Sequence, residues 1–279
     1  MSRAAVIETP VEADRLAECL DYAIIGPTDG RWRVRAPMPP PYSSICHIAR
    51  DFGTGGLSGC TAFLIAPRVL LTAGHCLFSL ARRRTPRRIL VTPARDGASR
   101  PYGAAWAEQW YVHPRFAARA DPRLDWGIIR LSRGFGLEPG LRLAALSSEA
   151  LERVRSSRLL RIAGYPSDKA PGELWAHAER LDGFGRHLMR YSVDTCPGHS
   201  GAPVWLDGAN AAGAVIAIHT RGPRPSARGP WGCRPGAPNA PPGHFNAGVR
   251  VTAPLLAAVA SSLAGNGPLA PLRPSPPPR

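Results

Sequence analysis

The chain lacks any long hydrophobic run. No stretch reaches the roughly 18 apolar residues of a membrane-spanning helix, so we expect neither a transmembrane helix nor a membrane partner. Residues 1–8 (MSRAAVIE) also lack the apolar core of a secretory signal. Three possibilities follow: the export signal is missing from this sequence, export uses another route, or the protein stays inside the cell. The hydrophobic content of 44% over 279 residues suits one large all-β unit or two closely packed halves.

Lysine is almost missing. Lys169 is the single lysine, and arginine supplies the rest of 35 basic residues, which against 20 acidic residues give a net charge of +15. Together with 31 prolines and 29 glycines, this composition is typical of a coding bias toward Ala, Arg, Gly and Pro. We therefore expect no nucleic-acid partner, and we predict a solvated loop for the arginine-rich residues 82–88. Acidic partners will still be attracted, and salt will weaken that attraction.

Cysteines are few, but their number is even. Six cysteines favour disulfides and an oxidising compartment, so the expected location is secreted or periplasmic.

Short apolar runs alternate with Gly- and Pro-rich turns, which indicates a sandwich or a barrel. Strands are predicted at residues 44–48, 59–65, 69–72, 88–92, 105–112, 127–131, 159–163, 190–194, 202–206, 214–219 and 248–251. A closing helix is predicted at residues 253–264 and a short capped helix at residues 9–20. Residues 1–30 are expected to be a pro-segment or an external strap. The Pro-rich residues 265–279 are predicted to be a disordered tail.

Three short strings carry the residue types that acyl transfer needs. They are residues 72–76 (TAGHC), 124–129 (LDWGII) and 196–203 (CPGHSGAP). Each contributes one polar residue, in the order His, Asp, Ser. Chymotrypsin-type double barrels use that order, whereas subtilisins and α/β-hydrolases use others.

His75 follows a predicted strand and precedes Cys76. Cys60 lies on the preceding strand, and a Cys60–Cys76 bridge would hold the loop that carries His75. Closing so short a loop contributes about 3 kcal/mol in the chain-entropy model. Because a bridge explains both cysteines, we do not interpret Cys60, His75 and Cys76 as a zinc site, and no metal or organic cofactor is expected.

Asp125 stands at the start of an apolar strand, where its carboxylate would be desolvated yet able to hold an imidazole through Nδ1–H. Asp121 is the alternative, but it precedes Pro122 in a charged turn. We therefore predict Asp125 as the orienting carboxylate.

Ser200 is the predicted nucleophile, because small residues keep the space beside it open. Gly198 and Ser200 are predicted to point their backbone N–H groups at a developing oxyanion. Cys196 is placed to anchor the pocket wall, with Cys233 as its expected partner. Cys19 and Cys46 remain, and their pairing would tie the N-terminal segment to the barrel.

With these strings, residues 22–262 resemble trypsin-like serine proteases of the chymotrypsin fold, and more narrowly bacterial glutamyl endopeptidases. The narrower resemblance rests on residues 22–31, 164–169, 191–195, 216–220 and 245–250. It implies an all-β fold of two packed six-stranded antiparallel β-barrels with a C-terminal helix, and a protease domain over residues 31–264.

The resemblance also implies a specificity pocket. In glutamyl endopeptidases a histidine on the strand after the nucleophile helps to neutralise the substrate glutamate, assisted by a threonine near the nucleophile loop. His219 and Thr195 match these positions, and an imidazole can donate a hydrogen bond to a carboxylate. His199 stands where trypsins carry the aspartate that binds a new N-terminus, so that activation ion pair is not available. The long loop at residues 221–243 leaves the glutamate preference open.

We therefore expect a monomeric serine endopeptidase that acts on peptide or protein substrates through His75, Asp125 and Ser200. Two alternatives remain. One is a catalytically idle binding module with a basic surface, and the other is an esterase that uses the same triad.

Overall fold

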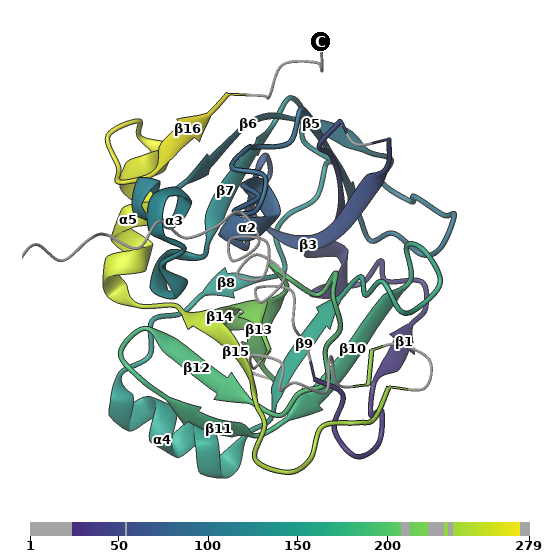
Figure 1. The fold of residues 1–279 in the computed structure, drawn as a ribbon, viewed down its shortest axis with the longest axis vertical. Coiled ribbons are helices and arrows are strands. Elements are labelled where there is room, and N and C mark those ends of the chain that lie inside the picture. Colours follow the sequence, from purple (N-terminus) through teal and green to yellow (C-terminus); the bar gives the residue numbers. More distant parts are fainter. Residues whose placement is uncertain (1–23, 54, 208–212, 223–231, 234–236, 274–279) are drawn as a thin grey trace, which may run out of the picture.

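The computed structural model describes residues 24–53, 55–207, 213–222, 232–233 and 237–273. Two β-sheets make up most of this part of the chain, and they lie one above the other along the longest axis in Figure 1. The short helix α2 lies in the upper half, beside β3 and β7. Of the predictions above, the helix at residues 9–20, Cys19, residues 223–231 and 234–236 of the predicted loop at 221–243, and residues 274–279 lie outside the described residues.

The first sheet closes into a barrel. Its strands are β2 (Ile45–Asp51), β3 (Leu57–Ala66), β4 (Val69–Thr72), β5 (Arg88–Pro93), β6 (Ala105–Val112), β7 (Gly127–Leu131) and β16 (Ala270–Leu272). They pair in the order β16-β6-β5-β2-β3-β4-β7, and an added β6–β7 pairing joins the six strands β2 to β7 into a ring. This confirms the predicted six-stranded barrel for the first half of the protein.

The second sheet has nine strands. They are β1 (Trp32–Val34), β8 (Arg142–Leu143), β9 (Leu160–Gly164), β10 (Leu174–Glu179), β11 (Leu181–Phe184), β12 (Leu188–Tyr191), β13 (Pro203–Leu206), β14 (Ala214–Arg221) and β15 (Asn246–Arg250). Eight pair in the order β1-β10-β9-β13-β14-β15-β12-β11, and β8 joins β14. No pairing within the described ranges closes this sheet. This half therefore has more strands than the six that the resemblance implies. The strand pattern in the sequence missed β10 and β11 as well as β1 and β8, which are too short for a period-two pattern to reveal them.

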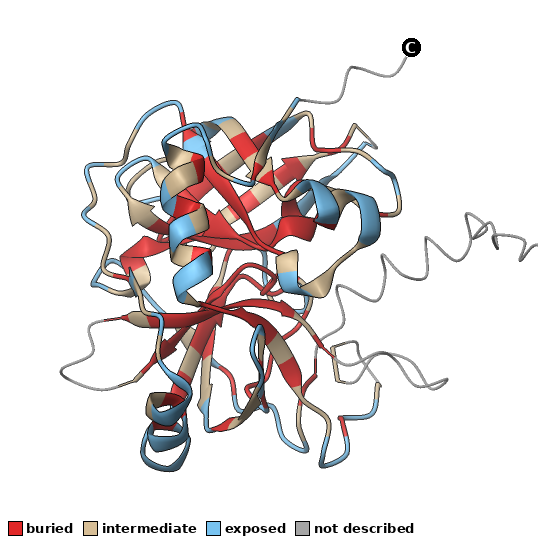
Figure 2. Ribbon diagram, turned by 90° about the vertical axis from the view of Figure 1, so that its left-hand side faces the viewer, coloured by how far each residue is buried: buried red, intermediate tan, exposed pale blue. Residues whose placement is uncertain are grey.

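Three groups of buried side chains hold the molecule together. One fills the first barrel, one lies within the second sheet, and a third joins the two sheets. Alternation along a strand divides the residues between them, since Leu64 of β3 faces the first barrel while Phe63 faces the second sheet. Figure 2 shows the buried positions concentrated in the strands of both halves, with exposed positions on the helices. Strands buried on both faces read as continuous apolar runs.

Four α-helices connect the strands in the described part of the chain, together with the 3-10 turns η1 (Tyr42–Ser44) and η2 (Pro122–Leu124). They are α2 (Gly74–Leu77), α3 (Pro114–Arg119), α4 (Ser148–Ser157) and α5 (Ala253–Leu263). The predicted closing helix is confirmed by α5, where Thr252 Oγ1 accepts from Leu255 N at 3.3 Å as an N-cap. The sequence analysis missed α4, although Ser147 caps it in the same way. No helix among the described residues is long and apolar enough to span a membrane.

The C-terminal segment differs from the prediction. Residues 270–272 form β16, which pairs with β6, and Gln109 Nε2 donates to Leu272 O at 2.9 Å. The prediction of disorder is therefore wrong at β16. Leu269 is buried, and Pro271 is tolerated because β16 is an edge strand.

Residues 24–30 lie against the second sheet. Ile24 and Ile25 are buried, and the backbone N–H groups of Gly26 and Gly30 donate to the Asp194 carboxylate at 2.7 and 2.8 Å. Asn246 also accepts from Ile24 N at 3.1 Å. These contacts join the start of the described chain to the segment that leads to Ser200.

Cys46 carries a free, buried thiol, so the expected pairing of Cys19 with Cys46 is wrong. Its sulfur lies 3.6 Å from Ser44 O on the inner face of β2, and burial raises the pKa of the thiol. The Cys46 side chain therefore packs in the core of the first barrel as a small hydrophobic group.

Candidate active site

His75 and Asp125 meet at the end of the first barrel. His75 lies in α2 directly after β4, and Asp125 directly precedes β7, whose Gly127 is paired with Thr72 of β4. The Nδ1 atom of His75 lies 3.1 and 3.0 Å from the two carboxylate oxygens of Asp125. The backbone N–H of His75 also donates to Asp125 Oδ1 at 2.9 Å. Asp125 is fully buried, and its carboxylate contacts two nitrogen atoms of the same residue, His75.

Asp121, the alternative carboxylate, takes part in a different cluster. Its oxygens accept from Arg123 at 2.7 Å and lie 3.6 Å from Arg115. The carboxylate caps η2 by accepting from Arg123 N. Of the two carboxylates considered from the sequence, Asp125 is the one that contacts His75.

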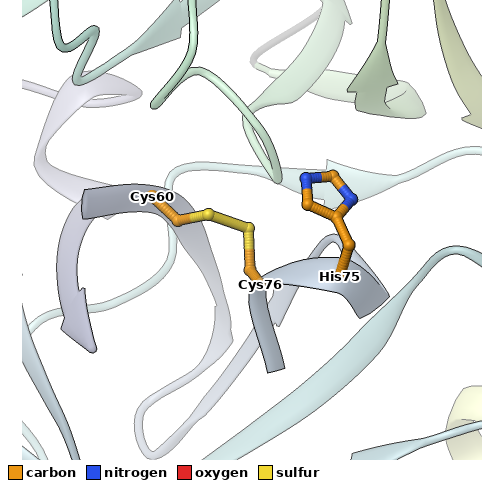
Figure 3. Close-up of side chains that lie close together, drawn as sticks. All are labelled: Cys60, His75 and Cys76. Atoms are coloured by element: carbon orange, nitrogen blue, oxygen red, sulfur yellow. A yellow bond between two sulfur atoms is a disulfide. The ribbon is translucent and has the colours of Figure 1, made fainter. Parts of the chain in front are cut away.

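The Cys60–Cys76 disulfide is formed, as predicted. Figure 3 shows the bridge beside the His75 ring, joining Cys60 of β3 to Cys76 of α2. The bridge anchors the one-turn helix that carries His75, which is too short to be stable alone.

Removing this bridge by Cys60→Ser together with Cys76→Ser is expected to lower the free energy of unfolding by about 3 kcal/mol, because the reduced unfolded chain gains loop entropy. Equilibrium denaturant unfolding measures the change. Cys46→Ala is the matched control, since it removes a buried thiol without opening a ring. An unchanged midpoint for the double variant would contradict the stabilising role of the bridge.

Cys60, His75 and Cys76 also bring three potential metal-ligand atoms within 4.8 Å of one another. The two sulfurs are bonded to each other, so neither is the thiolate that zinc requires while the bridge is intact. Among the described residues no other such cluster occurs. The donor atoms at this position therefore do not fit a metal site.

The loop that carries Ser200 belongs to the second half but packs on the first barrel. Thr61 N of β3 donates to Ser200 O at 2.9 Å, and Gly201 N donates to His219 O at 2.7 Å. Gly201 has φ +86°, and a Cβ atom there would overlap Thr72 Oγ1 and Thr61 O. Only glycine permits this approach, which brings Ser200 to the edge of β3 and β4.

Hydrogen bonds set the peptide planes on either side of Gly198 and Ser200. Pro197 O accepts from Ser167 N at 2.7 Å, so the N–H of Gly198 in the same trans peptide points the opposite way. His199 O accepts from Ala202 N at 2.8 Å, which turns the N–H of Ser200 away from that bond. Gly198 has φ +100° and lies against Tyr165 O, where a Cβ atom would not fit. The loop thus holds both predicted oxyanion donors in defined orientations.

His219 lies on β14 beside the nucleophile loop. Its ring is buried, and Nδ1 lies 2.9 Å from the hydroxyl of Tyr191 on β12. Burial lowers the pKa of His219 well below its usual value, and the nearby His199 and His75 lower it further. Burial raises the pKa of Tyr191, so its hydroxyl keeps its proton. The sequence analysis missed Tyr191, although an aromatic hydroxyl in a buried strand signals such a partner.

Thr195 is buried immediately before the second predicted disulfide, Cys196–Cys233, which is also formed. Its Oγ1 makes no hydrogen bond with any described residue. Thr195 N donates to Ile24 O at 3.0 Å, so the segment at residues 24–30 lies against the backbone of Thr195. The structure does not join the side chains of Thr195 and His219 by a hydrogen bond within the described ranges.

His199 is buried behind the nucleophile loop. Its Nδ1 lies 3.1 Å from Cys196 O, and burial lowers its pKa to about 3, with Arg31 adding to the effect. A neutral histidine at this position cannot form an ion pair with an amino terminus. The nearby carboxylate that does bind the N-terminal segment is Asp194, which the sequence analysis did not single out.

Comparison with known proteins shows which family this chain resembles. Residues 60–218, more than half of the chain, match the model of the trypsin-like peptidase domain. The chain is 30% identical over 204 residues to a glutamyl endopeptidase of Bacillus licheniformis, covering 72% of this chain and 61% of that protein. It is 30% identical over 202 residues to a protein of Bacillus subtilis named extracellular metalloprotease, covering 72% and 63%.

The chain thus spans about three fifths of the length of these two relatives. A solved structure of a Glu endopeptidase in complex with MPD superposes with a TM-score of 0.67 at 23% identity, covering 86% of this chain and 100% of that one. This likeness confirms the chymotrypsin-like fold. On the match over residues 60–218, which includes His75, Asp125 and Ser200, the chain belongs to the trypsin-like peptidase family.

Proposed function

We propose that this protein is a serine endopeptidase in which Ser200, His75 and Asp125 act together. The observation that carries the proposal is the buried contact between His75 Nδ1 and both oxygens of Asp125, at 3.1 and 3.0 Å. This contact selects the tautomer with the proton on Nδ1 and leaves Nε2 as a base. It also stabilises the imidazolium that forms when the base takes a proton.

In the proposed reaction the Ser200 hydroxyl attacks the scissile carbonyl carbon while His75 Nε2 accepts its proton. The carbonyl oxygen becomes an oxyanion that accepts from the N–H groups of Gly198 and Ser200, each worth about 100- to 1000-fold in rate. The intermediate collapses, the C–N bond breaks, and His75 returns the proton to the leaving amine. Water then attacks the acyl-enzyme by the same route and releases the acid product.

We further propose that the enzyme prefers glutamate before the scissile bond. Three features support this. The Tyr191 hydroxyl lies 2.9 Å from His219 Nδ1, and when it donates there His219 Nε2 is left as a donor. Thr195 Oγ1 makes no hydrogen bond with described residues, and a relative at 30% identity is named glutamyl endopeptidase. A neutral donor in a buried wall suits a carboxylate, since a hydrogen bond to a charged group is stronger than a neutral one.

The test compares wild type with His219→Gln on peptides that carry Glu, Asp, Ala, Phe or Arg before the scissile bond. We expect wild type to favour Glu, and the variant to lose about 10- to 100-fold in kcat/KM on Glu, because one charge-assisted hydrogen bond is removed. Cleavage after neutral residues is expected to change far less. Product identification by mass assigns each bond that is cut.

Two further variants sharpen this test. Tyr191→Phe keeps the ring but removes the donor to Nδ1, so a smaller loss of Glu preference is expected as the second tautomer becomes populated. His187→Gln, at an exposed position on the same half, is the matched control and should change no ratio. Equal losses by His219→Gln on every peptide would remove His219 from the specificity role.

The same assays separate the two alternatives. Binding of an acidic polymer that weakens with salt, without turnover of any peptide or ester, would instead support the idle binding module. Turnover of esters alone would support the esterase.

We also propose that the protein works in an oxidising compartment. The formed bridges Cys60–Cys76 and Cys196–Cys233 support this, as does the extracellular relative of Bacillus subtilis.

A further inference from the structure

A cavity of about 330 Å³ opens beside the nucleophile loop, and neither Thr195 nor His219 lines it. Gly198 forms one wall, and Ser58 and Gly59 of β3 form a second. Tyr165, Pro166 and Ser167 after β9 line a third side, and His47, Arg95, Lys169 and Gly172 contribute to the rest. The cavity belongs to neither buried wall of the glutamate pocket, and the proposed reaction has so far given it no role.

Its position assigns it to the leaving half of the substrate. A carbonyl oxygen held at Gly198 fixes the scissile bond, and the two halves of an extended peptide then run in opposite directions. The half before the bond is assigned to Thr195 and His219. The other half must pass His75, which protonates the leaving amine, and therefore the Cys60–Cys76 bridge and Gly59 next to it.

Arg95 is held rigidly at the wall of this cavity. Its Nε donates to Gly97 O at 2.9 Å, and its Nη1 lies 3.2 Å from His47 Nδ1. Burial lowers the pKa of His47 to about 3, so this ring is neutral and its Nδ1 can accept. Gly172 has φ +81°, and a Cβ atom there would overlap the Arg95 guanidinium. The glycine thus lets the guanidinium lie against the backbone, which limits the entropy that a bound ligand must overcome.

The positive charge of Arg95 has no carboxylate partner among the described residues. The acidic residues next to this region, Asp96 and Glu173, are both bound by Arg33, at 2.8 and 2.7 Å. Lys169, the other cation of the cavity, is neutralised by Asp29 at 3.0 Å and stacks 4.4 Å from the Trp175 ring. The cavity therefore presents one uncompensated, pre-positioned guanidinium beside serine hydroxyls and apolar walls.

We infer that this cavity binds an acidic side chain of the substrate within the first two positions after the scissile bond, with Arg95 as the residue that recognises it. The inference rests on the proposed function for the direction of the peptide. It makes the enzyme selective on both sides of the bond, through separate groups: a neutral histidine before it and an arginine after it.

The experiment uses peptides with Glu before the scissile bond and an amidated C-terminus. Matched pairs differ by Glu or Gln at the first or at the second position after the bond. One further peptide ends at the second position with a free carboxylate, which separates a terminal carboxylate from a side chain. Products are identified by mass, so that cleavage after the added glutamate is counted separately.

For wild type we expect kcat/KM to be about 10-fold higher for Glu than for Gln at one of the two positions, an advantage that shrinks as salt is added. Arg95→Ala is expected to abolish this ratio while Gln peptides are still cleaved, and Arg95→Lys to restore part of it. Arg100→Ala is the matched control: it removes a nearby exposed arginine outside the cavity lining and should keep the ratio.

Equal rates of wild type on Glu and Gln peptides at both positions would overturn the inference, whatever the variants do. A preference that only the free-carboxylate peptide shows would also overturn it. Equilibrium binding of the same peptides to Ser200→Ala decides the case in which no peptide is turned over. Tighter binding of Glu peptides that Arg95→Ala removes would then support the cavity although the proposed function had failed.

Discussion

Ser200→Ala is expected to lower kcat on a good peptide substrate by about a million-fold, the largest effect of any single change considered. Without the hydroxyl there is no nucleophile, and His75 and Asp125 have nothing to activate. Peptide binding should persist, because the walls formed by Thr195 and His219 are untouched. A fluorophosphonate, which reacts with activated serines, should label wild type at Ser200, as mapped by peptide mass, and should not label the variant.

Ser132→Ala is the matched control, since Ser132 is exposed and its hydroxyl donates to Trp106 O at 3.1 Å on the first barrel. Turnover and labelling should both remain at the wild-type level in this variant. Residual peptidase activity of Ser200→Ala near that of wild type, or labelling at another serine, would contradict the assignment of the nucleophile.

Asp125→Asn is expected to lower kcat by about 10,000-fold while leaving the fold intact. In the wild-type structure the carboxylate of Asp125 contacts both His75 N and His75 Nδ1, at 2.9 and 3.0 Å. The amide oxygen of an asparagine can accept only one of these bonds well. Its NH₂ group then faces Nδ1 and favours the tautomer with the proton on Nε2, which cannot accept a proton from serine. Single-turnover kinetics measure the acylation rate directly.

Asp121→Asn provides the comparison, because it makes the same chemical change four residues earlier in the chain. Its carboxylate pairs with Arg123 and Arg115 at the surface, so activity within about twofold of wild type is expected. Similar losses in the two variants would mean that net charge, rather than the contact with His75, controls the rate. Equal thermal unfolding of both variants excludes a folding defect.

Much of the fold could be predicted because its strands carry strong local signals. The runs at residues 69–72 and 127–131 correspond to β4 and β7 to the residue. The predicted closing helix corresponds to α5, which begins with a cap at Thr252 and a proline in its first turn. The elements that were missed carry weaker signals. Residues 174–179 of β10 read LWAHAE, with only partial alternation, and α4 contains so many charged residues that its apolar stripe is reduced to Leu151 and Val154.

The cysteines illustrate the limit of such reasoning. Cys60 lies on β3, which pairs with β4, and Cys76 lies in the helix that follows β4. The short connection keeps the two cysteines close, so their pairing follows from local topology. Cys46 also lies in a strand of the same barrel, but its side chain points into the core, and alternation within one strand does not reveal what encloses it. The error arose from assuming that an even number of cysteines is fully paired.

The sequence by itself determined the residue types of the candidate site, their order along the chain, and the two bridges beside them. These follow from chemistry encoded within a few consecutive residues. Only the tertiary structure decided that Ser200 bonds to Thr61, that Gly201 lies against Thr72, that the Tyr191 hydroxyl lies beside His219 Nδ1, and that Arg95 faces the cavity beside Gly198. Each of these contacts joins residues far apart in the chain. Such contacts depend on the packing of two sheets against each other, which no local pattern specifies.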